Sequence, residues 1–184
     1  AVRLRAFRKA MEAVFQYSDY AYLEELVKKA EPYAAADRLE NARVLFSRGR
    51  AFHLRGMVSE MMMDSESVLQ VFEEEYSLWD AAWGLLGIGV AQSSLGVSPE
   101  AIVAALRSIA LLEELGDFRW QMEAYFAAGV TFNLCFLEHE ALDLLAKIIE
   151  IDEKMKMGDY IRLFHANDVS AKSFFQMGDF EKAL

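Results

Sequence analysis

The feature that most constrains this chain is a helix–turn–helix pattern that recurs at nearly constant spacing. The clearest copy spans residues 82–117, with a predicted helix from Ala82 to Leu95, a turn at 96–99 and a second helix from Glu100 to Leu115. Sliding this unit along the sequence finds copies that begin at Leu4, Ala42, Ala82, Met122 and Phe164. The steps between these starts are 38, 40, 40 and 42 residues. Such a period is typical of repeat architectures, in which stacked copies share one continuous core.

Three positions of the repeat explain how two helices can pair within each copy. Position 8 is small in most copies and reads Met11, Gly49, Gly89, Gly129 and Ala171. Position 20, in the second helix, reads Leu23, Met61, Ala101, Ala141 and Ala183. Position 15, in the turn, reads Ser18, Gly56, Gly96, Phe136 and Gly178. Because paired helices approach closely where side chains are small, we expect positions 8 and 20 to face each other. We expect position 15 to adopt the left-handed conformation that ends a helix.

This pattern predicts an all-α chain of about five antiparallel helix pairs, of which the last is truncated. No segment shows the period-two alternation of a strand, and the apolar run from Ala101 to Leu112 is long enough to favour a helix. The expected helices are Val2–Gln16, Ala21–Tyr33, Leu39–Arg55, Ser59–Glu75, Leu78–Leu95, Pro99–Leu115, Arg119–Phe136, Glu138–Met157, Tyr160–Met177 and one that starts at Phe180.

Charge and apolar content exclude several classes of function. The formal net charge of −10 argues against direct nucleic-acid binding, which needs clustered positive charge. The charge is uneven, since residues 1–56 carry a net +4 and residues 57–184 a net −14. No uncharged apolar window is long enough for a transmembrane helix, so we expect no membrane partner. The single cysteine, Cys135, rules out an intramolecular disulfide and suits a reducing, cytoplasmic location.

The sequence contains no catalytic or metal-binding motif. The histidines His53, His139 and His165 lie in different copies, and neither a His-Glu-x-x-His nor a Cys-x-x-Cys spacing occurs. The acidic run at residues 73–75 falls in a predicted helix, whereas a calcium site needs a loop. We therefore expect no enzyme, no metal and no cofactor. An all-helical enzyme with a site between copies is the less favoured alternative.

The repeat resembles the tetratricopeptide repeat (TPR) family. The best local match is the segment 174–184, Phe-Phe-Gln-Met-Gly-Asp-Phe-Glu-Lys-Ala-Leu. The period exceeds the family's usual period of about 34 residues. It is similar to the longer-repeat branch, which supplies regulatory modules to bacterial signalling proteins and transcription activators. The resemblance implies a right-handed superhelix (α-solenoid) that forms a single domain over residues 1–184. It also implies a non-catalytic scaffold that binds proteins or peptides.

In this family the first helices of the copies line a concave groove, into which positions 2, 5, 9 and 12 point. Carried over residue by residue, the resemblance implies a groove with a basic end and an apolar centre. The candidate partner-binding residues are Arg5, Arg8, Arg43, Phe46, Arg50, Trp83, Leu86, Val90, Phe126 and Val130. The expected partner is an acidic amphipathic segment, held as a helix or as an extended peptide.

Both ends of the sequence suggest a fragment of a longer protein. The chain begins Ala-Val-Arg-Leu-Arg without an initiator methionine, and it stops inside a predicted helix at Leu184. These ends are consistent with a regulatory module attached to an output domain. Self-association is an alternative, with the exposed repeat ends pairing two chains into a homodimer. The apolar side of the last pair, which includes Phe164, Phe174 and Phe175, would then be covered by the second chain.

Overall fold

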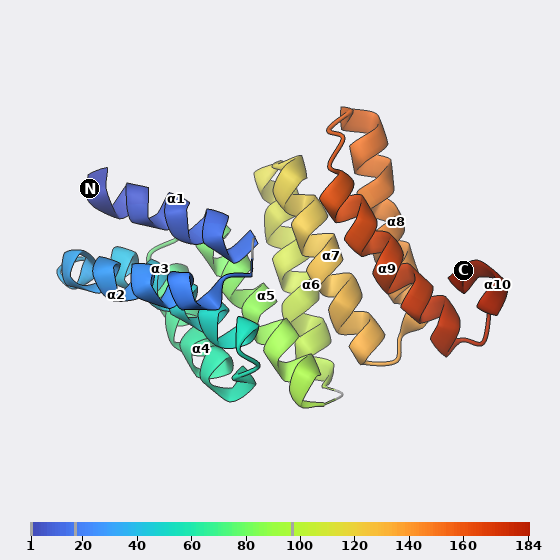
Figure 1. Cartoon of the computed structure of the whole chain (residues 1–184), viewed down its shortest axis with the longest axis horizontal. Helices are drawn as coiled ribbons and strands as arrows, with labels where there is room; N and C mark the ends of the chain where they lie inside the picture. The colour runs from blue at the N-terminus through green and yellow to red at the C-terminus, as the bar shows by residue number, and fades with distance from the viewer. Residues whose placement is uncertain (1, 17, 97) are drawn as a thin grey trace. The chain divides into compact units, whose positions relative to one another are not determined.

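The computed structural model of this chain describes residues 2–16, 18–96 and 98–184. In these ranges every regular element is an α-helix and no residue lies in a strand (Figure 1). The helices are α1 (Val2–Gln16), α2 (Tyr20–Ala34), α3 (Arg38–Leu54), α4 (Val58–Glu74), α5 (Leu78–Leu95), α6 (Pro99–Leu115), α7 (Phe118–Leu134), α8 (Glu138–Met155), α9 (Tyr160–Gln176) and α10 (Phe180–Ala183). All the expected helices are present, with ends within two residues of those predicted. Val97, in one expected turn, lies outside the described residues.

Side chains placed just before the helices explain where many of them begin. In each case the residue before the helix accepts a hydrogen bond from a backbone N–H of the first turn. These capping residues are Asp19, Asp37, Ser98, Asp117, Asp159 and Asp179. Each such cap contributes about 1 kcal/mol. Pro99 occupies the first turn of α6, where its missing N–H leaves no hydrogen bond unmade.

The turns inside the helix pairs depend on residues with positive φ. At position 15, φ is 55° at Ser18, 71° at Gly56, 59° at Phe136 and 79° at Gly178. The predicted left-handed conformation is therefore confirmed at these positions. Ser18 and Phe136 adopt it despite their Cβ atoms, which makes these two turns the strained members of the set.

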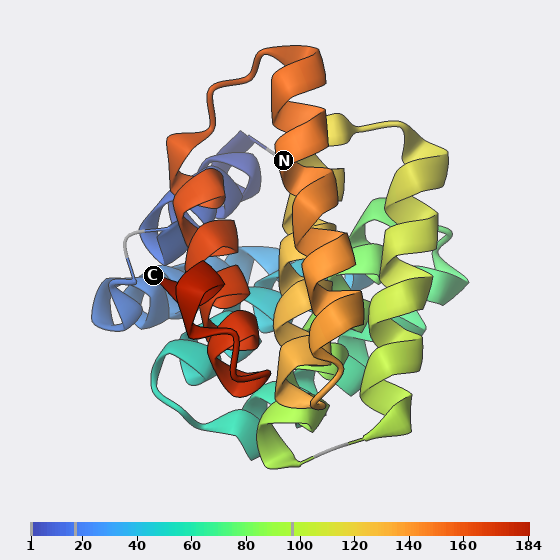
Figure 2. The same ribbon diagram turned by 90° about the vertical axis from the view of Figure 1, so that its right-hand side faces the viewer.

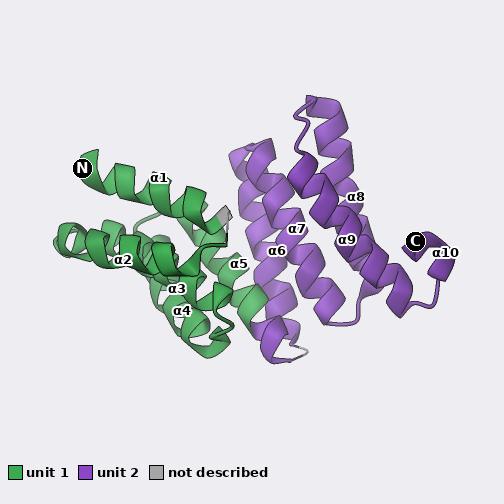
Figure 3. Cartoon of the chain, viewed as in Figure 1, with its two compact units in different colours: residues 1–91 green, residues 92–184 purple. Residues whose placement is uncertain are grey.

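Contacts divide the chain into two compact units, residues 1–91 and residues 92–184 (Figure 3). In unit 1, α1 packs on α2 and α3, and α3 packs on α2 and α4. In unit 2, α7 packs on α6, α8 and α9, and α9 packs on α8 and α10. The helices of unit 2 run alongside one another in Figure 2. Within each unit, a first helix thus contacts both its own second helix and the next first helix, as stacked repeats require.

The interface between the two helices of a pair, which we call the seam, is as narrow as the small residues at positions 8 and 20 predicted. A Cβ added to Gly49 of α3 would lie 3.6 Å from the carbonyl oxygen of Met61 in α4. A Cβ added to Gly129 of α7 would lie 3.6 Å from the carbonyl oxygen of Ala141 in α8. Positions 8 and 20 therefore face each other in these two copies. Large side chains that are almost completely buried fill the rest of the core, among them Met11, Leu23 and Phe72 in unit 1 and Leu112, Met122, Leu145 and Ile148 in unit 2.

Candidate partner-binding surfaces

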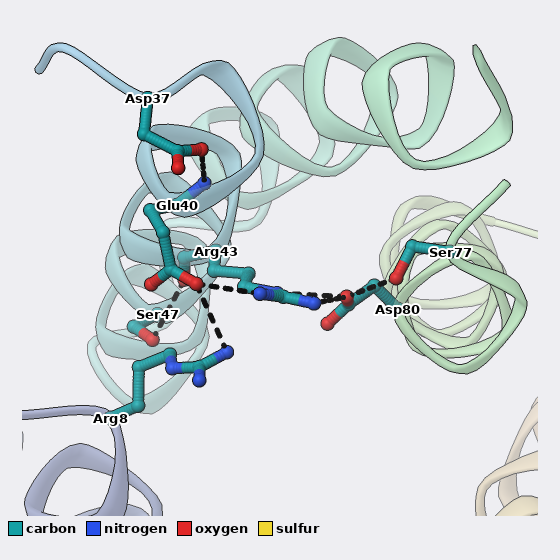
Figure 4. Close-up of polar contacts among 7 residues, drawn as sticks. All are labelled: Arg8, Asp37, Glu40, Arg43, Ser47, Ser77 and Asp80. Carbon is teal, nitrogen blue, oxygen red and sulfur yellow. Dashed lines mark hydrogen bonds and ion pairs between the residues drawn. The ribbon is translucent and has the colours of Figure 1, made fainter. Parts of the chain in front are cut away.

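We call the face of each first helix that carries positions 2, 5, 9 and 12 its groove face. In unit 1, the groove faces of α1, α3 and α5 carry most of the predicted site residues. Arg43 of α3 lies at the centre of this surface and is held by two carboxylates (Figure 4). Its Nε donates to Asp80 Oδ2 at 2.9 Å, its Nη2 lies 2.7 Å from the same oxygen, and its Nη1 donates to Glu40 Oε1 at 2.6 Å. Ser77 Oγ also donates to Asp80 Oδ2, at 2.5 Å.

These contacts stabilise the charged guanidinium of Arg43. Burial alone would lower the pKa of its guanidinium, but hydrogen bonds and charge attraction from Asp80 and Glu40 outweigh burial and raise that pKa. The positive charge of Arg43 is thus paired with Asp80 and Glu40 within the chain, which reduces its contribution to the expected basic end. The sequence interpretation counted the arginines of the groove faces and overlooked Glu40 and Asp80, which lie in the first turns of α3 and α5, two residues before a copy's first position.

Arg8 of α1 shares Glu40 with Arg43, but more loosely. Its Nη1 lies 3.5 Å from Glu40 Oε1 (Figure 4). Arg8 Nε and Glu40 Oε2 are both buried without a hydrogen-bond partner. The Arg8 side chain as a whole is 35% exposed, against 17% for Glu40. Arg5, one turn earlier on α1, is exposed.

Arg50 of α3 is surrounded by aromatic rings. Its guanidinium carbon lies 3.7 Å from the ring centroid of Phe15 on α1, 6.0 Å from that of Phe46 on α3 and 5.8 Å from that of Trp83 on α5. Cation–π contacts of this kind hold a guanidinium by its face. Burial lowers the pKa of the neighbouring His53, and the positive charge of Arg50 lowers it further. Residues of α1, α3 and α5 therefore build one surface in unit 1 on which aromatic rings surround a guanidinium.

The α5 residues of the predicted set differ in how much surface they present. Trp83 and Val90 are half-buried, whereas Leu86 is only 4% exposed. Leu86 therefore belongs to the core of unit 1 and does not contribute to its surface. The glycine-rich character of α5 explains this depth. Gly84 and Gly87 lie close to Leu69 and Ser65 of α4, so the two helices pack tightly around this part of α5.

In unit 2, the groove faces of α7 and α9 form a second aromatic surface. The predicted residues Phe126 and Val130 of α7 are both half-buried. The Phe126 ring centroid lies 5.9 Å from that of His165 on α9, and His165 lies 5.6 Å from Phe164. Phe164 is 69% exposed. His165 was absent from the predicted set, although position 2 of the last copy points to it.

Unit 2 also has a cavity of about 760 Å³. It is lined by Asn133, Asp168, Ala171, Lys172, Phe175, Gln176, Phe180, Ala183 and Leu184. Asn133 Nδ2 donates to Ser173 Oγ at 2.8 Å and to Gln176 Oε1 at 2.7 Å, which ties α7 to α9 beside the cavity.

The described residues hold no group of three or more His, Cys, Asp or Glu side chains able to bind a metal ion. Among the helices described, none has the length and apolar character needed to cross a membrane.

Comparison with known proteins establishes the fold. No protein-family model matches the sequence, and no curated protein matches it. A solved structure of a putative kinesin light chain from Podosopora anserina, described as having nearly identical TPR-like repeats, matches with a TM-score of 0.69. Its identity to this chain is 15%, and the match covers 98% of this chain and 90% of the other. A variant of that protein matches with a TM-score of 0.71 at 15% identity, over 98% and 89% of the two chains. The predicted all-α, TPR-like repeat fold is thus confirmed.

Proposed function

We propose that this chain is a non-catalytic scaffold whose groove faces bind a protein or peptide segment. The observation that supports this function is the gathering of half-buried aromatic side chains on the groove faces of each unit. In unit 1, Phe15, Phe46 and Trp83 surround Arg50. In unit 2, Phe126 and His165 pack beside the exposed Phe164. Aromatic residues and arginine are enriched at the centres of protein interfaces, where they supply most of the binding energy.

The proposed partner is an acidic amphipathic segment. Its apolar side chains would bury against the aromatic groups, and its carboxylates would meet the arginines of α1 and α3. The net charge of −10 makes nucleic acid a poor ligand. Following the sequence resemblance, we place the scaffold in the cytoplasm, as a regulatory module attached to the output domain of a bacterial signalling protein.

Peptide selection on the immobilised protein tests this function. We expect phage-displayed peptides that bind the wild-type protein to lose about 2 kcal/mol of affinity on Trp83→Ala. For peptides that bind the groove faces of unit 2, Phe126→Ala should weaken binding in the same way. Leu106→Ala is the matched control, because Leu106 is 48% exposed on α6, a second helix that carries no groove face. Thermal melting of each variant would show that it remains folded. Binding that depends on Leu106 but not on Trp83 or Phe126 would place the site elsewhere.

Self-association is the second candidate, and the exposed aromatic residues of the last helix pair favour it. Phe164, Phe175 and Phe180 are 69%, 65% and 58% exposed. A second copy that covered these rings would remove a large apolar area from water. Light scattering at several protein concentrations would detect such pairing, and Phe175→Ser should then reduce it. A mass that stays monomeric across concentrations would eliminate this candidate.

A further inference from the structure

A single carboxylate oxygen, Oε1 of Glu40, serves two arginines on the groove faces of unit 1. It accepts a hydrogen bond from Arg43 Nη1 at 2.6 Å and lies 3.5 Å from Arg8 Nη1 (Figure 4). The other oxygen, Oε2, is buried and has no hydrogen-bond partner. The two arginines are therefore held very unequally.

Arg8 is the weakly held one of the two. Its only ion pair among the described residues is the 3.5 Å contact with Glu40, which is longer than a charge-assisted hydrogen bond. Its Nε is buried without an acceptor. A buried N–H of a charged group that has no hydrogen-bond acceptor destabilises the conformation in which it is buried. Arg43, by contrast, makes close contacts with Asp80 and Glu40 that fix it in place.

We propose that Arg8 binds a carboxylate of the partner, and that Glu40 substitutes for this carboxylate when no partner is present. This inference rests on the proposed function and assigns the acid-binding role to one residue. A guanidinium pairs with a carboxylate most favourably through two parallel N–H···O bonds. A partner carboxylate that bound Arg8 through Nε and one Nη would supply the acceptor that Nε lacks. Glu40 would keep its 2.6 Å contact with Arg43.

Position and charge also favour Arg8 for this role. Its side chain is 35% exposed, so it can turn toward a ligand without unfolding α1. Its neighbours on α1 include the exposed Arg5 and Lys9, so an acidic segment would be attracted to this helix. Arg43 is unsuited to the role, because a ligand would have to displace Asp80 and Glu40 together.

The test measures binding of fluorescein-labelled hexaglutamate by fluorescence anisotropy at an ionic strength of about 0.15 M, where charges are screened beyond about 8 Å. Glu40→Gln removes the competing charge but keeps a side-chain oxygen for Arg43. We expect Glu40→Gln to bind this probe about fivefold more tightly than the wild-type protein, which is the lower end of the usual coupling between two sites. The matched control is Glu24→Gln, which removes one negative charge from the Arg55–Glu24 pair at 2.8 Å. It should leave the affinity within about twofold of wild type, as expected for a charge whose field is screened.

The double variant Arg8→Gln with Glu40→Gln should lose the gain, and thermal melting would show that each protein is folded. Equal gains from Glu40→Gln and Glu24→Gln would overturn the proposal, because long-range charge alone would then explain the effect. A gain that persists in the double variant would also overturn it, because another cation would be binding the probe. Failure of the probe to bind any variant would do the same.

The proposed function is tested separately by the selected peptides. Peptides that depend on Trp83 but bind equally well after Arg8→Gln would leave the scaffold function standing and remove the role of Arg8.

Discussion

Arg162 on α9 and Glu123 on α7 form an ion pair that repeats the Arg43–Asp80 pair of unit 1 with the charges exchanged. Arg162 Nε donates to Glu123 Oε2 at 2.9 Å, and its Nη2 lies 2.7 Å from the same oxygen. In both pairs, the residue at position 2 of one copy contacts a residue near the start of the next copy. That second residue lies two places before position 1 of its copy. The fold thus requires complementary charges at this junction but does not dictate which side carries which charge.

The Glu123–Arg162 pair should contribute measurably to stability, because Arg162 is only 8% exposed. Burial alone would lower its pKa, yet the charges of Glu123 and Asp159 raise it. Glu123→Gln would leave a buried guanidinium with Asp159 as its remaining carboxylate. We expect the free energy of unfolding to fall by about 2 kcal/mol, less than for a buried pair that is broken completely. Urea denaturation would measure this change. Glu25→Gln, which removes the exposed Glu25–Lys29 pair, should leave the unfolding midpoint unchanged.

The turn after α7 should become more stable when Phe136 is replaced by glycine. Phe136 has φ of 59° and is 67% exposed, so its Cβ strains the backbone while its ring makes few contacts. Phe136→Gly should raise the free energy of unfolding by about 1 kcal/mol. Gly56 occupies the same repeat position with φ of 71° and open space around it. Gly56→Ala should therefore lower stability by about 1 kcal/mol through the backbone alone. Thermal or urea unfolding that gives both changes the same sign would contradict this account.

The helices could be predicted from the sequence because their determinants are local. Apolar spacing defines each helix, and residues such as Asp117 and Ser98 mark where helices start. Position 15 was recognisable from its glycines, and the structure extends the same conformation to Ser18 and Phe136. The small residues at positions 8 and 20 identified the seam, since two backbones can approach closely only where side chains are short.

The candidate surface could be predicted only in part, because its charges are paired between copies. Asp80 lies 37 residues from Arg43 in the sequence, and their contact exists only once the copies stack. Glu40 and Asp80 each lie two residues before a copy's first position, which is the signal that would have found them. Leu86 and Phe46 share position 5, yet Leu86 is buried and Phe46 half-buried. How deeply the position 5 side chain of α5 is buried depends on how closely α4 approaches α5, and the sequence periodicity does not specify this distance.

Stability should also depend on pH through His53. Burial and then the charge of Arg50 lower its pKa below the ordinary value of 6.5, so the folded state favours neutral imidazole. The unfolded chain therefore takes up a proton first as the pH falls. The stability that His53 contributes is fully present above about pH 6.5 and is lost as the pH falls through this value toward the lower folded pKa. Urea unfolding between about pH 7.5 and pH 5.5 should show this loss, and His53→Gln should reduce it.

Replacing glycine by alanine at position 8 should have opposite effects on stability at Gly49 and at Gly129. A Cβ on Gly49 would lie 3.4 Å from Asp64 Cβ and 3.6 Å from Met61 O, which are ordinary contacts. Gly49→Ala should therefore stabilise the protein by about 0.5–1 kcal/mol, the helix-propensity difference between the two residues. A Cβ on Gly129 would lie 2.9 Å from Leu145 Cδ2 and 3.0 Å from its Cγ, and Leu145 is only 1% exposed. Gly129→Ala must displace a packed side chain, and overpacking of this kind costs about 1–3 kcal/mol, so we expect a net loss of stability. Urea unfolding of both variants would measure the difference. Equal stabilisation by the two would mean that Leu145 can move freely, and that the α7–α8 seam is looser than the contacts at Gly129 indicate.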